Sequence, residues 1–192
     1  MLEENIEEKL KNKALLLTAQ GRSGWDQRHT LRTVYWMREL IKTEGGDERV
    51  LVPAMYFHDT GYVPLRVGYN HKECLEAKPD HANAGALLAQ EFLPTLDYFT
   101  DEEINEIVRL VKNHSTHNNI VDKNRQLVFE ADSLGQMDWQ VIEPTYDNEN
   151  CLIFLDTTFK DNNIPFFRTE SGKKILNEIL PEAYNFVKER KE

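Results

Sequence analysis

The sequence predicts an all-α protein with a single domain. Apolar residues recur every three to four positions along most of the 192 residues, which is the period of a helix, whereas the alternation typical of strands is not sustained anywhere. No internal repeat, low-complexity tract or Gly/Ser-rich linker divides the chain. A chain of this length can bury a sizeable core, so we expect one compact domain rather than two.

Two helices and a loop are expected in the first half of the chain. The first helix spans about 25–41, with a capping box in residues 23–26 and a glycine pair, 45–46, at its end. The second helix spans about 48–59 and ends in the sequence His-Asp-Thr-Gly. Residues 62–79 include prolines, glycine and asparagine that interrupt helices, so we expect a loop there.

The second half of the chain is also expected to be helical. Asp80 is expected to cap a helix rich in small residues that ends near Pro94. Thr100 and Glu103 have the spacing of a second capping box. The helices expected in this half lie at about 81–92, 103–114, 123–141, 150–159 and 171–188.

Charge and apolar content exclude several classes of partner. The formal net charge of −10 argues against binding to duplex nucleic acid, which requires a broad basic face. It is compatible with a small phosphorylated substrate, because a bound metal supplies positive charge locally. No apolar run approaches the ~20 residues of a membrane span, and the N-terminus lacks the apolar core of a signal peptide. We therefore expect a cytoplasmic protein with no membrane partner, in which Cys74 and Cys151 are free thiols.

Several helices place a histidine or an aspartate where an apolar residue is expected. His58 lies on the apolar stripe of its helix, three residues after Met55. His114 continues the apolar stripe of a later helix, and Asp132 stands four residues after Val128. A buried carboxylate is costly unless it is paired, protonated or bound to a metal. Neutral imidazoles together with carboxylates suit a divalent transition metal, so these residues are candidate metal ligands.

The order of these residues resembles that of a known family. His29, the adjacent pair His58-Asp59 in AMYFHDTGY, and Asp132 in VFEADSLGQMD follow one another along the chain. In this order they resemble the HD-domain superfamily of metal-dependent phosphohydrolases. The resemblance implies a helical bundle in which the four residues hold one divalent ion, which could be Mn, Fe, Co, Ni, Mg or Zn. It also implies a single HD-type domain over 1–192, with the metal-site core at about 26–138 and a helical extension over 139–192.

Two further histidines leave open whether the site binds one metal ion or two. His81 in PDHANAG and His114 in LVKNHSTHNN lie between the His-Asp pair and the last aspartate. This order resembles the dinuclear members of the superfamily, in which the aspartate of the pair, here Asp59, bridges two ions and the extra histidines complete the second site. The alternative is that both histidines orient substrate or water near a single ion. One or two divalent metal ions are therefore expected.

The resemblance implies hydrolysis of a small phosphorylated substrate, a nucleotide or related phosphoester, by attack of metal-bound hydroxide. Asp59 is the expected catalytic residue, because it would orient the nucleophile or accept its proton. Arg66, in the loop beyond the His-Asp pair, is expected to bind the substrate phosphate, since a guanidinium matches phosphate oxygens. Other candidate phosphate clamps are Arg28, Arg32, Arg109 and Lys112.

Two other functions stay open from the sequence. The same order of six ligands occurs in diiron oxygenases of the superfamily, which resemble myo-inositol oxygenase. The third alternative is a non-catalytic module with a structural metal or a ligand-sensing pocket. Residues 60–63, which follow the His-Asp pair, lack the residues that define better-known branches, so no substrate is singled out. The oligomeric state is also open, and a homodimer is compatible with the sequence.

Overall fold

The computed structural model describes residues 1–62, 70–77, 80–117 and 120–191 of the chain. Helices account for 74% of the structure, and the described residues include no strand. The predicted all-α fold class is therefore confirmed.

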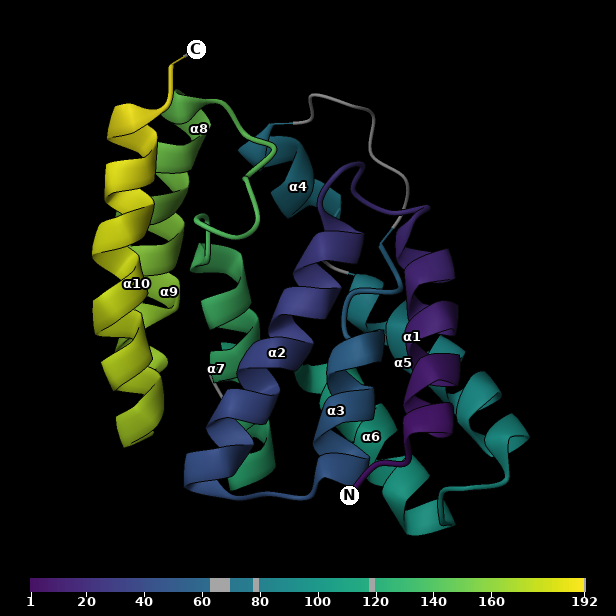
Figure 1. The fold of residues 1–192 in the computed structure, drawn as a ribbon. Coiled ribbons are helices and arrows are strands. Elements are labelled where there is room, and N and C mark those ends of the chain that lie inside the picture. Colours follow the sequence, from purple (N-terminus) through teal and green to yellow (C-terminus); the bar gives the residue numbers. More distant parts are fainter. Residues whose placement is uncertain (63–69, 78–79, 118–119, 192) are drawn as a thin grey trace.

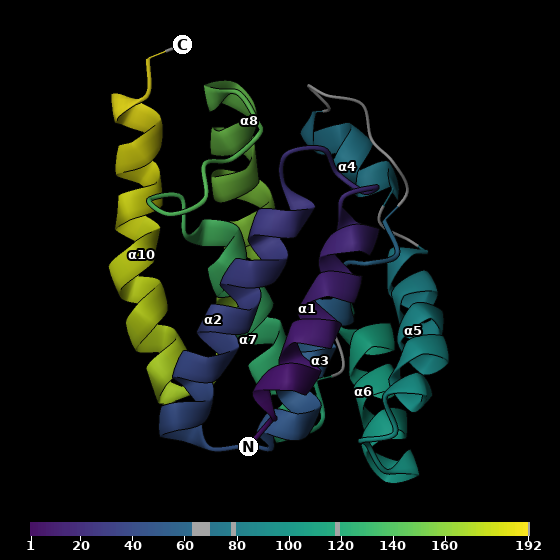
Figure 2. The same cartoon turned by 45° about the vertical axis from the view of Figure 1, so that its right-hand side comes forward.

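Five helices carry the residues discussed below, and they pack as a bundle (Figure 1). α2 (Asp26–Glu44) packs on α7 (Lys123–Met137) and on α3 (Glu48–Phe57). α6 (Asp101–Asn113) packs on α3 and on α5 (His81–Phe92). Figure 2, turned by 45°, shows α5 and α6 at one edge of the bundle and α2 and α7 nearer its middle. Side chains from five separate helices therefore face a common interior.

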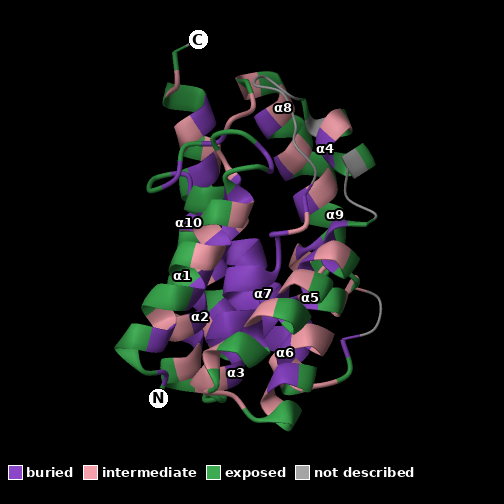
Figure 3. Cartoon of the chain, turned by 90° about the vertical axis from the view of Figure 1, so that its right-hand side faces the viewer, coloured by how far each residue is buried: buried purple, intermediate pink, exposed green. Residues whose placement is uncertain are grey.

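Helix α7 is buried along most of its length and lies at the centre of the view in Figure 3. It begins at the N-cap Asp122, whose side chain accepts a hydrogen bond from the backbone N–H of Arg125. Leu127, Ala131 and Leu134 are fully buried. The helix ends at Met137, four residues before the predicted end at 141, because the backbone turns at Asp138 (ψ 60°). An aspartate on this helix is therefore surrounded by protein on most sides.

The N-terminal helix α1 (Glu4–Thr18) was not predicted. Its buried residues Ile6, Leu10 and Ala14 follow one another at intervals of four and pack against α2 and α3. This spacing is a helical signal. The charged residues between them keep the apolar content of the segment low. The apolar stripe is therefore narrow and gives a weak helical signal.

At two predicted helix starts, the side-chain capping differs from the prediction. No side chain caps α2, and its N-cap is Trp25 rather than Ser23, so the predicted capping box over 23–26 is wrong. The side chain of Asp26 accepts instead from the backbone N–H and the guanidinium of Arg22, which fixes the loop before the helix. α5 starts after Asp80 as predicted, but without a side-chain cap hydrogen bond.

Capping boxes are present at the predicted start of α6 and within the segment predicted as a loop. The box of Thr100 and Glu103 at the start of α6 is confirmed. The expectation of a loop over 62–79 is wrong in part, because α4 (His71–Ala77) lies within it. Asn70 and Glu73 form a reciprocal pair of backbone-to-side-chain hydrogen bonds at its start. Asn70, expected to interrupt a helix, is thus the N-cap of α4.

The C-terminal extension packs along α7. It consists of α8 (Asn148–Ile153), the π-helical segment η3 (Phe154–Phe159), α9 (Lys160–Asn162) and α10 (Glu170–Glu189). The short element η4 (Ile164–Phe166) lies between α9 and α10 in this extension, and η1 (Leu93–Leu96) directly follows α5. In Figures 1 and 2, α10 lies at the edge of the bundle opposite α5. The predicted helices at 150–159 and 171–188 are confirmed with small shifts of their bounds.

A buried carboxylate on α7 fastens α10 to the bundle. Glu130, which is fully buried, accepts hydrogen bonds from the backbone N–H groups of Arg168 and Thr169 and from the side chains of Thr169 and Gln126. Arg168 and Thr169 lie at the start of α10, where N–H groups lack partners within the helix, whereas Gln126 lies on α7 itself. The extension is therefore tied to the core by specific hydrogen bonds as well as by apolar packing.

The structure also bears on the cysteines and on membrane-spanning helices. Cys74 and Cys151 are buried and unpaired with one another, as predicted. Among the described residues, no helix combines the length and the apolar character needed to cross a bilayer.

Candidate metal centre

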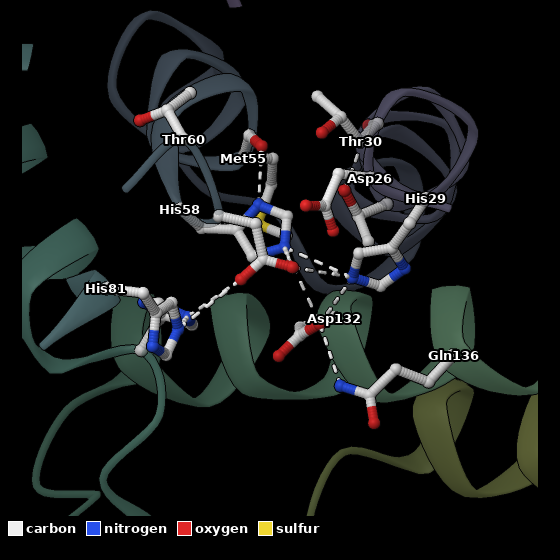
Figure 4. A network of polar contacts seen from close by, with 12 residues as sticks. Asp26, His29, Thr30, Met55, His58, Thr60, His81, Asp132 and Gln136 are labelled. Atoms are coloured by element: carbon white, nitrogen blue, oxygen red, sulfur yellow. Dashed lines mark hydrogen bonds and ion pairs between the residues drawn. The ribbon is translucent and has the colours of Figure 1, made fainter. Parts of the chain in front are cut away.

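Six side chains that the sequence singled out meet inside the bundle. They come from the first turn of α2, the ends of α3 and α6, the start of α5 and the middle of α7, and none is more than 8% exposed. Figure 4 shows His29, His58, His81 and Asp132 directed toward one region between the helices. The full set is His29, His58, Asp59, His81, His114 and Asp132.

One cluster is formed by His29, His58 and Asp132. The Nε2 atoms of the two histidines lie 3.2 Å apart. Oδ1 of Asp132 lies 3.0 Å from Nε2 of His29 and 3.6 Å from Nε2 of His58. Oδ2 of Asp59 lies 3.4 Å from each of these two nitrogens. Four potential ligand atoms therefore face one point.

A second cluster is formed by His81 and His114 around the other oxygen of Asp59. Their Nε2 atoms lie 2.9 Å apart, and each is 3.4 Å from Oδ1 of Asp59. The carboxylate of Asp59 thus presents one oxygen to each cluster. The structure brings the two predicted histidines to this aspartate rather than to isolated places in the core.

The helix ends orient two of the imidazoles. Nδ1 of His58 donates to the carbonyl oxygen of Met55 at 2.7 Å, and Nδ1 of His114 donates to that of Val111 at the same distance. Both histidines are C-caps, and the carbonyls they bind belong to the last turn of each helix; that of Val111 also accepts from the backbone N–H of His114. In the neutral imidazole this fixes the proton on Nδ1 and leaves the Nε2 lone pair directed into the cluster.

The electrostatics of the site favour ionised carboxylates. Burial raises the pKa of Asp59, but His58 and Arg22 outweigh it, so the pKa lies well below its usual range. The pKa of Asp132 is likewise raised by burial and brought well below its usual range by His29 and His58. Burial lowers the pKa of His114 to about 4, with a further contribution from the nearby His81, so this imidazole is neutral.

The donor atoms fit a divalent transition metal. Ligand atoms held ~2.1 Å from one ion lie roughly 3.0–3.4 Å from one another in octahedral or tetrahedral geometry. The measured separations, 3.0–3.6 Å in the first cluster and 2.9–3.4 Å in the second, are close to this range. Facing imidazole lone pairs repel unless a proton or a cation lies between them. Both clusters therefore suit a cation.

Sequence reasoning missed Arg22 and Asp26, which lie behind the first cluster, and Tyr62, which packs against the second. The Arg22 guanidinium donates to Oδ1 of Asp26 from Nε and to Oδ2 of Asp59 from Nη2, both at 2.5 Å. It also lies 3.8 Å from the ring centre of Tyr62, which in turn stacks on His81. The signal available was weak: an Arg and an Asp four residues apart at a helix start.

Gly61 explains how His81 reaches Asp59. A Cβ at this position would overlap the backbone carbonyl of His81 and come within 2.5 Å of the backbone nitrogen of Gly85. Only a glycine allows the chain after the His-Asp pair to pass this close to the first turn of α5. The contact places the start of α5 beside the end of α3.

The two clusters open onto a cavity. It is lined by Asp59, His81, His114 and Asp132 on the side of the clusters, and by Gln136, which donates to Oδ1 of Asp132 at 2.9 Å. Arg22 is a cation within this lining. The arrangement places a metal-binding group at the base of a space that a small molecule can enter.

The predicted phosphate clamps are placed elsewhere or are not described. Arg66 lies outside the described residues. Arg28 donates to the backbone carbonyls of Gly24 and Glu143, Arg32 pairs with Asp138, and Arg109 pairs with Glu106 and Asp122. Lys112 is exposed on α6. These four side chains are not part of the described lining of the cavity.

A family model and a solved structure are similar to this chain. The family model described as HD domain matches residues 27–137, more than half of the chain. The crystal structure of a predicted HD superfamily hydrolase from an uncultured Thermotogales bacterium superposes with a TM-score of 0.60. That protein is 19% identical, and the match covers 94% of this chain and 88% of the other, which shows a shared fold. No curated protein matches.

Proposed function

Because the chain belongs to the HD-domain family, we propose that it is a metal-dependent phosphohydrolase acting on a small phosphorylated substrate, a nucleotide or related phosphoester. The observation that supports this most strongly is the pair of His/Asp clusters that share Asp59 at the base of a cavity. Two clusters are more than a structural metal requires, since one closed site suffices to stabilise a fold.

Each predicted ligand has a place in this proposal. His29, His58 and Asp132 hold one divalent ion, and His81 and His114 hold the other. When bound, the ions supply a water molecule of lowered pKa and positive charge for the phosphoryl oxygens. Asp59 faces both positions, one oxygen to each, and in its ionised form it orients the attacking water or accepts its proton.

The residues around the clusters keep this arrangement fixed. Arg22 holds Oδ2 of Asp59, and the Gln136 amide holds Oδ1 of Asp132. The carbonyls of Met55 and Val111 hold the rings of His58 and His114. Such outer hydrogen bonds set the tautomer and direction of a ligand, and their loss weakens metal sites.

The test is a screen of the purified chain reconstituted separately with Mn, Fe, Co, Ni, Mg and Zn. Phosphate release from a panel of nucleotides and phosphomonoesters and oxygen uptake are recorded together. We expect phosphate release with at least one metal and no oxygen uptake. Oxygen uptake with iron in place of phosphate release would instead identify oxygenase chemistry. No turnover with any metal, in a protein equally stable without metal, would identify a non-catalytic module.

Two variants and a control accompany the screen. Asp59→Ala and His58→Ala are expected to abolish phosphate release while the helical circular dichroism stays unchanged. His117→Gln is the matched control, since this histidine lies outside both clusters and its Nδ1 donates to the carbonyl of Asn162. Activity that survives in both site variants would refute the assignment of the clusters.

A further inference from the structure

We propose that residues 139–158 form a specificity wall that binds an uncharged aromatic or apolar group on the alcohol part of the substrate. The wall consists of six of the seven cavity-lining residues that follow the family match, the seventh being Asn163: Trp139, Pro144, Thr145, Tyr146, Phe154 and Thr158. This inference rests on the proposed function for the position of the phosphate, and it names the class of group attached to it.

The two sides of the cavity differ in chemistry. Asp59 and Asp132 and the histidines lie on one side, where metal ions would attract a phosphate. The specificity wall contains three aromatic rings, a proline and three hydroxyls, one of them on Tyr146, and no charged side chain. A charged group placed against it would lose its hydration without gaining a partner of opposite charge. An aromatic or apolar group would instead stack on the rings and bury its surface.

The π-helical segment Phe154–Phe159 turns two side chains toward the cavity. Phe154 and Thr158 line the cavity, while Leu155 and Phe159 of the same segment are buried in the core. A π-helical turn inserts an extra residue and shifts the register of the following side chains, and such turns are frequent at functional sites. Side chains on one face of the segment therefore pack in the core, and side chains on the other face line the cavity.

Packing from behind keeps the specificity wall in place. The indole N–H of Trp139 donates to the carbonyl of Gln136 at 2.7 Å. Its ring lies 6.2 Å from that of Phe154 and, on α10, 6.2 Å from that of Phe186. Nη1 of Arg190 donates to the carbonyl of Tyr146 at 2.6 Å. The surface is therefore formed before a ligand arrives, as in most small-molecule sites.

The experiment compares benzylphosphonate with methylphosphonate, two probes that differ in the aromatic group and are not hydrolysed. Their dissociation constants are measured by calorimetry on the manganese-loaded protein, so the readout is binding and does not require turnover. We expect benzylphosphonate to bind at least ~10-fold more tightly than methylphosphonate. Equal binding of the two probes, or binding of neither, would overturn the proposal.

Three variants locate the preference. Phe154→Ala is expected to reduce it roughly 3- to 10-fold. Thr158→Phe projects a large ring from the wall into the cavity and is expected to abolish the preference for benzylphosphonate. This variant keeps the test decisive if Phe154→Ala is unstable. Ile153→Ala is the control, because this neighbouring side chain is 42% exposed and lies outside the cavity. A loss of preference in Ile153→Ala equal to that in the other two would contradict the assignment.

The outcome is independent of the phosphatase screen. If benzylphosphonate is preferred but no phosphoester is hydrolysed, the specificity wall stands and the proposed function fails. If phosphoesters are hydrolysed and the probes bind alike, the proposed function stands and the wall fails.

Discussion

The guanidinium of Arg22 donates from Nη2 to Oδ2 of Asp59 at 2.5 Å, to the same oxygen that faces His29 and His58. Arg22 is itself held by Asp26, which is fully buried. Burial lowers the pKa of Arg22, but the carboxylates of Asp26 and Asp59 outweigh it and keep the pKa well above its usual range. A permanent positive charge therefore stands behind the carboxylate that joins the two clusters.

Replacing Arg22 should destabilise the protein strongly. Arg22→Ala leaves the buried carboxylates of Asp26 and Asp59 without their partner, which costs on the order of 3–5 kcal/mol. Urea unfolding of the metal-free protein measures this loss. Arg28→Ala, which removes an exposed arginine bonded only to loop carbonyls among its described partners, should cost less than ~1 kcal/mol. Similar losses in the two variants would show that the buried network contributes little.

Metal counting tests the two clusters separately. Protein saturated with Mn should hold about two ions per chain, because each cluster offers several facing ligand atoms. His81→Ala should lower the count toward one, since it removes a ligand of the second cluster only. His117→Gln should leave it unchanged. A count of one in the unmodified protein would leave His81 and His114 as residues that orient substrate or water.

Gly61→Ala should disturb the second cluster more than the first. The added Cβ overlaps the backbone of His81, so the start of α5 must move away from Asp59. We expect the manganese content to fall toward one per chain while the first cluster stays occupied, and the melting temperature to fall by several degrees. Full occupancy with an unchanged melting temperature would show that the close approach is not required.

The C-terminal extension should unfold together with the rest of the chain. Glu130→Ala removes the acceptor for three donors of Arg168 and Thr169 at the start of α10 and for the amide of Gln126 on α7, and should lower the free energy of unfolding by about 2–4 kcal/mol. Thermal unfolding, followed by circular dichroism and tryptophan fluorescence, should show one transition in both proteins. Glu149→Ala, at an exposed position, is the control. Two separate transitions would mean that the extension is an independent domain.

The ion pair between α3 and α6 should make stability depend on pH. Hydrogen bonds from Arg49 hold the pKa of Glu103 below its usual range. Because the folded-state pKa is depressed, this stabilisation is present at neutral pH and is lost as the pH falls through the folded pKa. Glu103→Gln should therefore cost about 0.5–1 kcal/mol at pH 7, and the difference should shrink below about pH 4.

Glutamine keeps the capping box of α6, so this variant removes the charge and little else. Glu102→Gln, an exposed neighbour in the same turn, is the control and should change stability less. The measurement is the free energy of unfolding by urea at a series of pH values. A difference between Glu103→Gln and the unmodified chain that persists at low pH would contradict the ion-pair explanation.

Most of the helices could be predicted because their signals are local. The capping box of Thr100 and Glu103 and the apolar stripe of α6 lie within one segment, and both are confirmed. The errors at Ser23 and Asn70 have a common cause: the same residue type starts one helix and interrupts another, and which it does depends on its hydrogen-bond partners. Helix α1 was missed because its buried stripe is narrow.

The sequence by itself determined which residues are candidate ligands, since a histidine or an aspartate in an apolar stripe is recognisable from periodicity and order alone. Only the tertiary structure decided how they group, with Oδ2 of Asp59 facing His29 and His58 and Oδ1 facing His81 and His114. The same holds for Arg22, whose contacts to Asp59 and Cys74 span 37 and 52 residues of sequence. Periodicity reports the environment of each helix face, whereas the direction of a carboxylate oxygen depends on how five helices pack together.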